Sequence, residues 1–68
     1  MSNISRKDEK QIQNLSPITF NERGVVWFNG GYYDKAIADY SQAISLDPTF
    51  ALAYMNRGTA WAESRNRG

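Results

Sequence analysis

Apolar and small side chains recur at intervals of three and four residues along most of the chain, from residue 17 onward. This spacing places them on one face of an α-helix, whereas a half-buried strand alternates with a period of two. Three stretches carry the helical pattern, and proline or glycine separates each from the next. The pattern therefore predicts an all-α chain with three helices and no strand.

The first predicted helix has a clear start signal. Ser16 is a favourable N-cap, and Pro17 suits the first helical position, where its missing N–H leaves no hydrogen bond unmade. Leu15 and Phe20 have the spacing of a hydrophobic staple. Thr19-x-x-Glu22 provides a competing capping box three residues later. Both alternatives start a helix here.

The second predicted helix follows a break at Asn29-Gly30-Gly31, where glycine readily ends a helix. It closes near Leu46-Asp47-Pro48, because proline moves the preceding residue out of the α region. Its apolar face carries six residues at helical spacing: Tyr33, Ala36, Ile37, Tyr40, Ala43 and Ile44. Its other face is expected to be solvated: Lys35, Asp39, Ser41, Gln42 and Ser45.

The third predicted helix runs from Thr49 or Ala51 to about Ser64. Asp47-Pro48 is expected to cap it, as Ser16-Pro17 caps the first, and residues 65–68 are expected to fray. Its apolar and small positions are Leu52, Tyr54, Met55, Gly58, Trp61 and Ala62.

Residues 1–15 form a polar segment, predicted to be a flexible lead-in; a short docked helix from Ser5-x-x-Asp8 is the alternative. The chain is 41% hydrophobic and 22% charged, with a net charge of +1. That charge gives no electrostatic basis for binding nucleic acid or an anionic membrane. No apolar run approaches the roughly 20 residues that span a bilayer. No targeting segment is seen, so a cytoplasmic location is the default expectation.

The residues for catalysis are largely missing. The chain has no cysteine and no histidine, so it lacks thiolate chemistry and the commonest transition-metal ligand. Asp34, Asp39 and Asp47 are expected to be caps or solvated carboxylates. The second helix has only Lys35, too few cations for a DNA-reading helix. We therefore expect no enzyme, no metal and no cofactor.

A longer repeat underlies the helical pattern. Phe20-x-x-Arg23-Gly24-x-x-Trp27 recurs as Tyr54-x-x-Arg57-Gly58-x-x-Trp61, a shift of 34 residues. Such a fixed period indicates a stacked-repeat architecture. Gly24 and Ala36 are small enough to let two antiparallel helices approach closely.

On these residues the chain resembles the tetratricopeptide repeat (TPR) family. The resemblance covers residues 16–50 as a complete repeat and residues 51–68 as the first helix of a second, incomplete repeat. It implies an α-solenoid fragment: an antiparallel helical hairpin plus a third helix. The repeat-packing positions are Phe20, Gly24, Trp27, Tyr33, Ala36, Tyr40, Ala43 and Pro48. Arg23 and Arg57 replace the leucine usual in the family. The start signal at residues 15–17 is three residues out of register with Asp47-Pro48, so we expect an array to begin here.

The resemblance also implies a function, that of a non-enzymatic scaffold or adaptor that binds a protein or peptide partner. The partner would lie in a groove lined by the first helices of successive repeats: Ile18, Asn21, Val25, Phe28, Asn29, Leu52, Met55, Thr59, Ala62 and Glu63. Asn21, Asn29 and Asn56 would hydrogen-bond its backbone. The competing interpretation makes the apolar members of this set packing contacts. A carboxylate clamp is not supported, because Asn21 and Val25 stand where it has lysine and asparagine.

Two further alternatives concern the repeated motif. Tyr54, Gly58 and Trp61 would face a partner helix of the second repeat, which suggests a structural unit that self-associates through its third helix, as a dimer or by domain swap. Arg23 and Arg57 would be anion contacts, or would lie on neighbouring aromatic rings with the guanidinium in water or near a carboxylate. The structural role is the one expected.

Overall fold

The computed structural model describes residues 15–67. These residues form three helices, α2 (Pro17–Asn29), α3 (Tyr33–Leu46) and α4 (Ala51–Arg67). Within the described range there is no strand, so the predicted all-α class is confirmed. The predicted lead-in, with its alternative helix from Ser5-x-x-Asp8, lies outside the described residues except for Leu15. Gly68 lies outside them as well.

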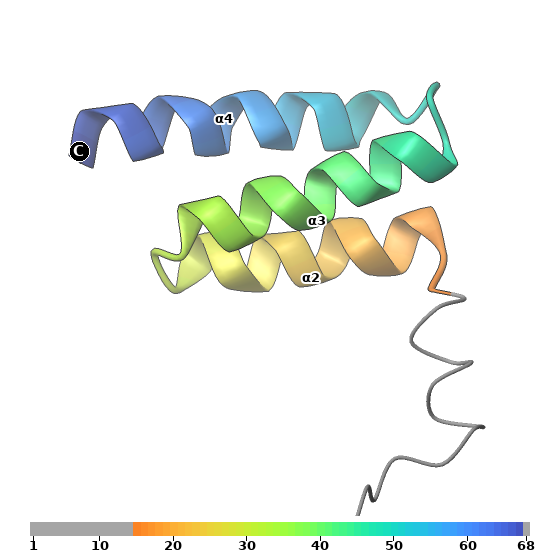
Figure 1. Cartoon of the computed structure of the whole chain (residues 1–68), viewed down its shortest axis with the longest axis horizontal. Coiled ribbons are helices and arrows are strands. Elements are labelled where there is room, and N and C mark those ends of the chain that lie inside the picture. Colours follow the sequence, from red (N-terminus) through yellow and green to blue (C-terminus); the bar gives the residue numbers. More distant parts are fainter. Residues whose placement is uncertain (1–14, 68) are drawn as a thin grey trace, which may run out of the picture.

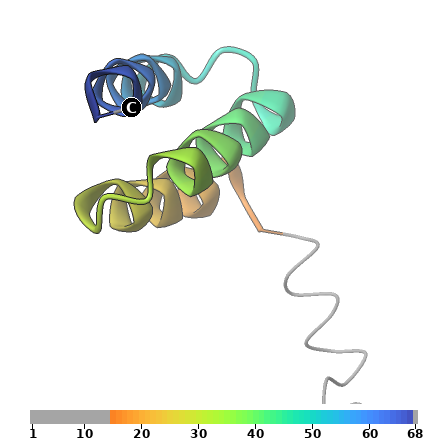
Figure 2. The same cartoon turned by 60° about the vertical axis from the view of Figure 1, so that its left-hand side comes forward.

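The three helices form a thin, flat unit. Helices α2 and α3 run antiparallel, and α4 packs mainly against α3 while also contacting α2 (Figure 1). In a second view α3 lies in front of α2, and α4 lies above both (Figure 2). The Cα atoms extend over 41 × 29 × 14 Å, so the shortest dimension is about a third of the longest. Each helix therefore keeps a large part of its surface open.

Helix α2 begins where the sequence predicts. The Ser16 Oγ accepts a hydrogen bond from the Thr19 backbone N–H at 3.1 Å, and Pro17 occupies the first turn. The Ser16 signal is therefore the one used, and the competing Thr19-x-x-Glu22 box does not start the helix. Leu15 packs against the buried Phe20, as the staple spacing predicts.

The turn between α2 and α3 depends on glycine at one position. Gly31 has φ = +84°, a left-handed conformation that other residues rarely adopt. The Tyr32 N–H then donates to the Trp27 carbonyl at 2.9 Å and closes the turn. The predicted break at Asn29-Gly30-Gly31 is confirmed.

The third helix starts at Ala51, one of the two predicted starts, but the predicted cap and the predicted C-terminal end are wrong. The Asp47 carboxylate accepts from the Thr49 N–H at 3.1 Å and from the Thr49 hydroxyl at 2.7 Å, so it closes a turn and does not cap α4. The helix starts at Ala51, too far along for that short side chain to reach its N–H groups. At the other end α4 continues to Arg67 and does not fray at residue 65. Arg65 and Arg67 favour this end, because cations stabilise a helix C-terminus.

Two small clusters make up the core, and each draws residues from all three helices. One contains Phe20, Ala43 and Ala53, and the other contains Ala36, Tyr40 and Ala60, against which Trp27 packs. Within residues 15–67, Tyr40 is the one large side chain that is almost fully buried, at 2% exposure. The core thus consists mainly of alanine packed against a few aromatic rings.

The face by which α4 packs on α3 differs from the predicted apolar face. Ala53 and Ala60 are fully buried there, whereas Leu52, Met55 and Trp61 are about half exposed or more. Small side chains allow the helices to approach closely, and the larger residues are left on the other faces of α4. Sequence reasoning missed the two alanines because a hydrophobic pattern weights large side chains; their spacing of seven residues was the available signal.

Asp39 was expected on a solvated face, and that expectation is wrong. Asp39 is only 6% exposed. Its two carboxylate oxygens accept from the Nε and Nη2 of Arg23 at 2.7 and 2.8 Å. Burial of this carboxylate is tolerated because the guanidinium satisfies both oxygens.

Candidate protein-interaction surfaces

The predicted groove between α2 and α4 is closed at one point by a side-chain hydrogen bond. The Asn56 Nδ2 donates to the Asn21 Oδ1 at 3.0 Å. Asn21 is only 5% exposed, so its amide links the two helices. The expectation that Asn21 hydrogen-bonds a peptide backbone is therefore wrong, since that amide is buried in the fold.

Beside this link lies a small hollow that all three helices line. It has a volume of about 110 Å³, and its lining residues are Val25, Phe28, Tyr40, Asn56 and Thr59. Three of these side chains supply apolar surface and two supply polar groups. The Thr59 hydroxyl donates to the Met55 carbonyl at 3.1 Å, which leaves its oxygen free to accept. We call this feature the groove hollow.

The other predicted groove residues lie outside the hollow. Ile18, Leu52 and Met55 are 60%, 48% and 64% exposed, and Asn29 is also exposed. Of the ten predicted groove residues, the structure places Val25, Phe28 and Thr59 together around the hollow. Tyr40 comes from the second helix of the repeat, so a rule based on first helices did not select it.

The charged side chains next to the groove hollow are acidic. Glu22 is three residues before Val25, and Glu63 is four residues after Thr59, spacings that place each on the same helix face as its partner. No Lys or Arg occupies an equivalent position three or four residues from a hollow-lining residue of α2 or α4. Within residues 15–67 neither glutamate takes part in an ion pair.

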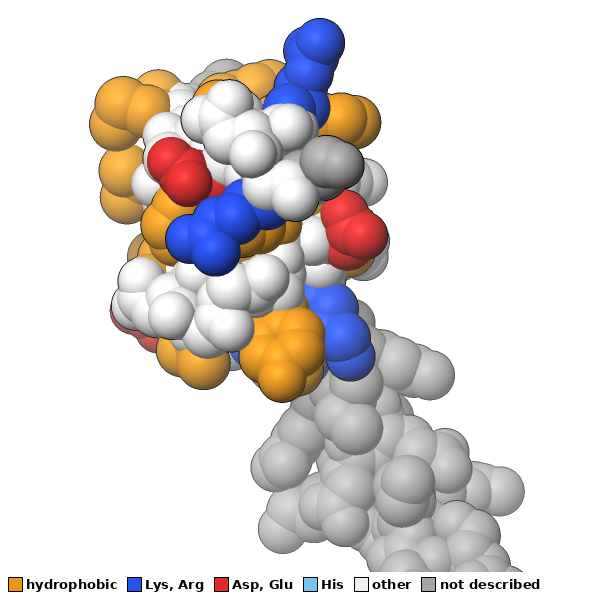
Figure 3. Space-filling model, turned by 90° about the vertical axis from the view of Figure 1, so that its left-hand side faces the viewer, with side chains coloured by type: hydrophobic (Ala, Val, Ile, Leu, Met, Phe, Trp, Pro, Cys, Tyr) orange, Lys and Arg blue, Asp and Glu red, His pale blue; other side chains and the backbone are white. Residues whose placement is uncertain are grey.

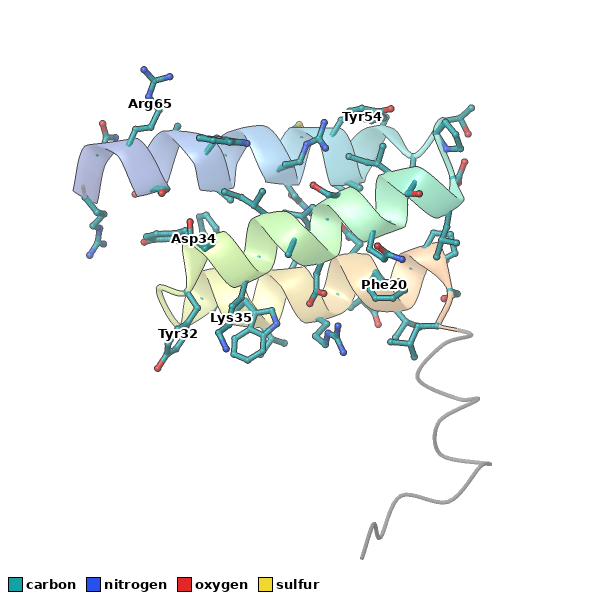
Figure 4. The ribbon with its side chains drawn as sticks, viewed as in Figure 1. Phe20, Tyr32, Asp34, Lys35, Tyr54 and Arg65 are labelled. Carbon is teal, nitrogen blue, oxygen red and sulfur yellow. The ribbon has the colours of Figure 1, made fainter. Side chains whose placement is uncertain are left out.

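A second open surface lies on α4, on the side away from α3. Tyr54 and Trp61 are 42% and 54% exposed. Gly58 lies between them along the helix, and a Cβ added there would have no heavy atom within 4 Å. Figure 4 shows Tyr54 and Arg65 on this side of the helix. We call the surface made by Tyr54, Gly58 and Trp61 the outer face of α4.

The equivalent face of α2 is covered by α3. A Cβ added at Gly24 would lie 2.5 Å from the Tyr40 Cε1. Trp27 packs against the cluster that contains Tyr40, and Lys35 Nζ lies 4.8 Å over its indole ring. The same motif is thus buried in one repeat and open in the other.

Arg23 and Arg57 both lie against aromatic rings, as expected for a structural role. The Cζ of Arg23 lies 5.4 Å from the centre of the Phe20 ring, and that of Arg57 lies 5.5 Å from the Tyr54 ring. Hydrogen bonding to Asp39 raises the pKa of Arg23 above its already high ordinary value. Arg57 instead donates from Nη1 to the Ser41 hydroxyl at 3.2 Å.

A larger hollow, of about 390 Å³, lies at the end of the molecule formed by the α2–α3 turn and the end of α4. Its charged lining residues are Asp34, Lys35 and Arg67, and the Arg67 Cζ lies 5.7 Å from the centre of the Tyr33 ring. Figure 3 views this end, where basic side chains adjoin hydrophobic ones. Because the lining carries both signs of charge, its electrostatics favour neither an anionic nor a cationic ligand.

The described residues hold no cluster of acidic side chains that could bind a metal ion. Burial raises the pKa of the Tyr40 phenol, because desolvation disfavours the charged phenolate. Among residues 15–67, no helix has the length and apolar content needed to cross a membrane.

Comparison with known proteins supports the repeat identified in the sequence. A family model for the TPR repeat matches residues 24–63, which is more than half of the chain. No solved structure matches the chain. The match covers the second half of α2, all of α3 and most of α4, in agreement with about one and a half repeats. The chain belongs to the TPR repeat family.

Proposed function

We propose that the chain binds a short segment of a partner protein in the groove between α2 and α4. TPR repeats generally mediate protein–protein interaction, and the family is in general a non-enzymatic scaffold. The groove hollow is the observation that carries the proposal, because it is the place where both first helices meet an apolar depression.

The hollow suits one aliphatic side chain. Val25, Phe28 and the Tyr40 ring surround about 110 Å³, which is comparable to a side chain of the size of valine or leucine. Burying such a side chain contributes about 1.5–3 kcal/mol. Asn56 and Thr59 line the same hollow, and in this proposal the Asn56 amide oxygen and the Thr59 oxygen accept hydrogen bonds from the backbone on either side of the anchor.

The charges beside the hollow favour a basic partner. Glu22 flanks it on α2 and Glu63 flanks it on α4. No Lys or Arg lies three or four residues from a hollow-lining residue on either helix. A lysine or arginine next to the aliphatic anchor would meet one of these carboxylates. Exposed pairs of this kind add at most about 1 kcal/mol and weaken as salt rises. These charges therefore contribute more to the choice between partners than to the affinity for any one partner.

Titration with a designed peptide tests the proposal. We expect the amidated and acetylated peptide Ala-Lys-Leu-Lys-Ala to shift the amide resonances of Val25, Phe28 and Thr59 in the full chain. Replacing the peptide leucine with alanine should weaken binding about tenfold or more, because the anchor no longer fills the hollow. Replacing both lysines with glutamate should weaken it further at low salt.

The chain offers a matched pair of adjacent valines as controls. Val25 lines the hollow, whereas Val26 is 68% exposed and is not among its lining residues. Val25→Lys should abolish binding of the basic peptide, and Val26→Lys should leave it unchanged. Equal effects of the two substitutions, or shifts confined to other residues, would rule out the groove as the binding site.

Self-association through the third helix is a second candidate, favoured by the half-exposed Tyr54 and Trp61. Apolar surface of this kind marks interfaces in soluble proteins. Two copies would then pair through the outer face of α4. Light scattering on a size-exclusion column tests this directly, and a monomer mass at high micromolar concentration would exclude it.

A further inference from the structure

The sequence before α2 contains the combination of side chains that the groove hollow favours in a partner. Residues 1–14 include two branched aliphatic residues, Ile4 and Ile12, and three cations, Arg6, Lys7 and Lys10. Isoleucine is an isomer of leucine, so it has the right size for a hollow of about 110 Å³. The chain therefore carries a candidate occupant for its own groove hollow.

The length of chain before α2 decides which isoleucine can reach the hollow. Leu15 is held at the start of α2, where it packs against Phe20. Val25, which lines the hollow, follows Leu15 by ten residues, or about 15 Å along a helix. Ile4 precedes Leu15 by eleven residues, which span up to about 36 Å when extended. Ile12 precedes it by three residues, which span only about 10 Å, so Ile4 can reach the hollow and Ile12 cannot.

The direction of the chain also brings a cation to a carboxylate. A segment that joins Leu15 to an Ile4 side chain in the hollow runs along the groove from the N-terminal end of α2. Arg6 lies two residues from Ile4 towards that end and, in an extended segment, on the same side of the backbone. Glu22 lies on the same side of Val25, three residues nearer the N-terminal end of α2. Arg6 is thus directed to a carboxylate that forms no ion pair within the part of the chain that the structure describes.

We propose that residues 4–6 occupy the groove hollow of the same chain, with Ile4 between Val25 and Phe28 and with Arg6 beside Glu22. The inference rests on the proposed function, because it uses the same hollow and the same ligand chemistry. A short tether gives the segment an effective concentration on the order of millimolar at the hollow. A partner segment must displace it, so the free chain binds partners more weakly than its groove would by itself.

Amide resonances of the isotope-labelled full chain test the occupancy without any partner present. Ile4→Asp should empty the hollow and shift the amides of Val25, Phe28 and Thr59, because a charged side chain cannot serve as the apolar anchor. Ile12→Asp introduces the same charge at a position that cannot reach the hollow, and it should leave those three amides unchanged. Equal shifts from the two substitutions, or no shift from Ile4→Asp, would overturn the inference.

A spin label locates the segment directly. The chain has no cysteine, so Asn3→Cys provides a single attachment site. A nitroxide at this position should broaden the amides of Val25 and Thr59, and adding Ile4→Asp to the labelled chain should remove most of the broadening. The broadening should not depend on protein concentration. An increase with concentration would contradict the inference, because the segment of a second copy would then be the occupant.

Exchanging the two charges tests the register of the segment. Arg6→Glu should move the Val25 amide towards its position in the Ile4→Asp chain, because two carboxylates would then face each other. Combining Arg6→Glu with Glu22→Arg should restore the natural position, since the pair is kept with its signs exchanged. Lys7→Glu is the matched control and should have a smaller effect, because neighbouring side chains of an extended segment point to opposite sides. Equal effects of Arg6→Glu and Lys7→Glu would exclude this register.

Titration with the peptide Ala-Lys-Leu-Lys-Ala separates this inference from the proposed function. The Ile4→Asp chain should bind the peptide about two- to tenfold more tightly than the natural chain, because the competing segment no longer fills the hollow. The Ile12→Asp chain should bind it as the natural chain does. Equal affinities of the natural and Ile4→Asp chains would overturn the inference and leave the groove proposal standing. Absence of binding to the Ile4→Asp chain would overturn the groove proposal instead.

Discussion

The dipeptides Arg23-Gly24 and Arg57-Gly58 occupy the same place on α2 and α4, but their surroundings differ. Tyr40 and Asp39 cover the first pair. Gly58 faces open space, and Arg57 contacts only Ser41 of α3 by hydrogen bond within residues 15–67. The same local sequence is therefore a packing contact in one repeat and an accessible surface in the other.

This difference shows that burial of the motif depends on which helix packs against it and not on the sequence of the motif itself. Trp27 is partly buried under α3, and Trp61, at the same position of the next helix, is 54% exposed. Of the two glycines in the repeated motif, only Gly24 is required for packing, because the Tyr40 ring contacts it. The following substitutions test how far the two copies differ.

The largest difference is expected for the aromatic residues. Tyr40→Ala should lower the free energy of unfolding by about 3–5 kcal/mol, because it empties the centre of the core. Trp61→Ala removes a half-exposed side chain and should change it by less than about 0.5 kcal/mol. Urea unfolding followed by circular dichroism measures both. Similar losses would mean that α4 is covered as α2 is.

The two glycines should respond with opposite signs. Gly24→Ala places a methyl group against the Tyr40 ring and should destabilise the fold by about 1–3 kcal/mol. Gly58→Ala meets no neighbour and should stabilise α4 by about 0.5–1 kcal/mol through helix propensity. Thermal unfolding of the two variants gives the comparison, and two changes of the same sign would contradict it.

The Arg23–Asp39 ion pair should contribute less to stability than the packing of Tyr40 does. Asp39→Asn should lower stability by about 1–2 kcal/mol, since Arg23 is about half exposed and water partly replaces its partner. Arg57→Gln should have an effect of at most about 0.5 kcal/mol. Unfolding measured at low and high salt tests whether the loss comes from the ion pair. The part of the salt dependence that this pair contributes should disappear in Asp39→Asn and remain in Arg57→Gln.

The smallest expected effect is a dependence on alkaline pH. Burial raises the pKa of Tyr40 above its ordinary value of about 10, so the folded state favours the neutral phenol. This contribution is complete below pH about 10 and is lost as the pH rises through the higher pKa of the folded state. Tyr40→Phe keeps the ring on Gly24 but cannot ionise. Its unfolding midpoint should fall less than that of the natural chain above pH about 10.

The elements of the fold could be predicted from local sequence. The Ser16 cap, the glycines at 30 and 31 and the proline at 48 act within a few residues of themselves, so they mark the first two helices correctly. The third helix was less well predicted, because Asp47 uses its carboxylate to close the turn at Thr49. Its C-terminal end was predicted too early, because the polar run from Arg65 onward was interpreted as frayed.

The candidate surfaces could be predicted only in part. The repeat pattern placed Val25, Phe28 and Thr59 near one another, and the structure lines one hollow with them. It also selected Asn21, which is buried and paired with Asn56. Which amide is accessible depends on the distance between α2 and α4, and a single-helix pattern carries no information about that distance.

The sequence by itself determined the helices, their turns and the 34-residue repeat, because capping, glycine conformation and hydrophobic spacing act over short distances along the chain. Tertiary structure alone decided that Asp39 is buried against Arg23, that Ala53 and Ala60 form the contact of α4, and that the outer face of α4 is open. Those outcomes depend on which helix lies next to which face. For that reason two identical Arg-Gly pairs have different surroundings in one small protein.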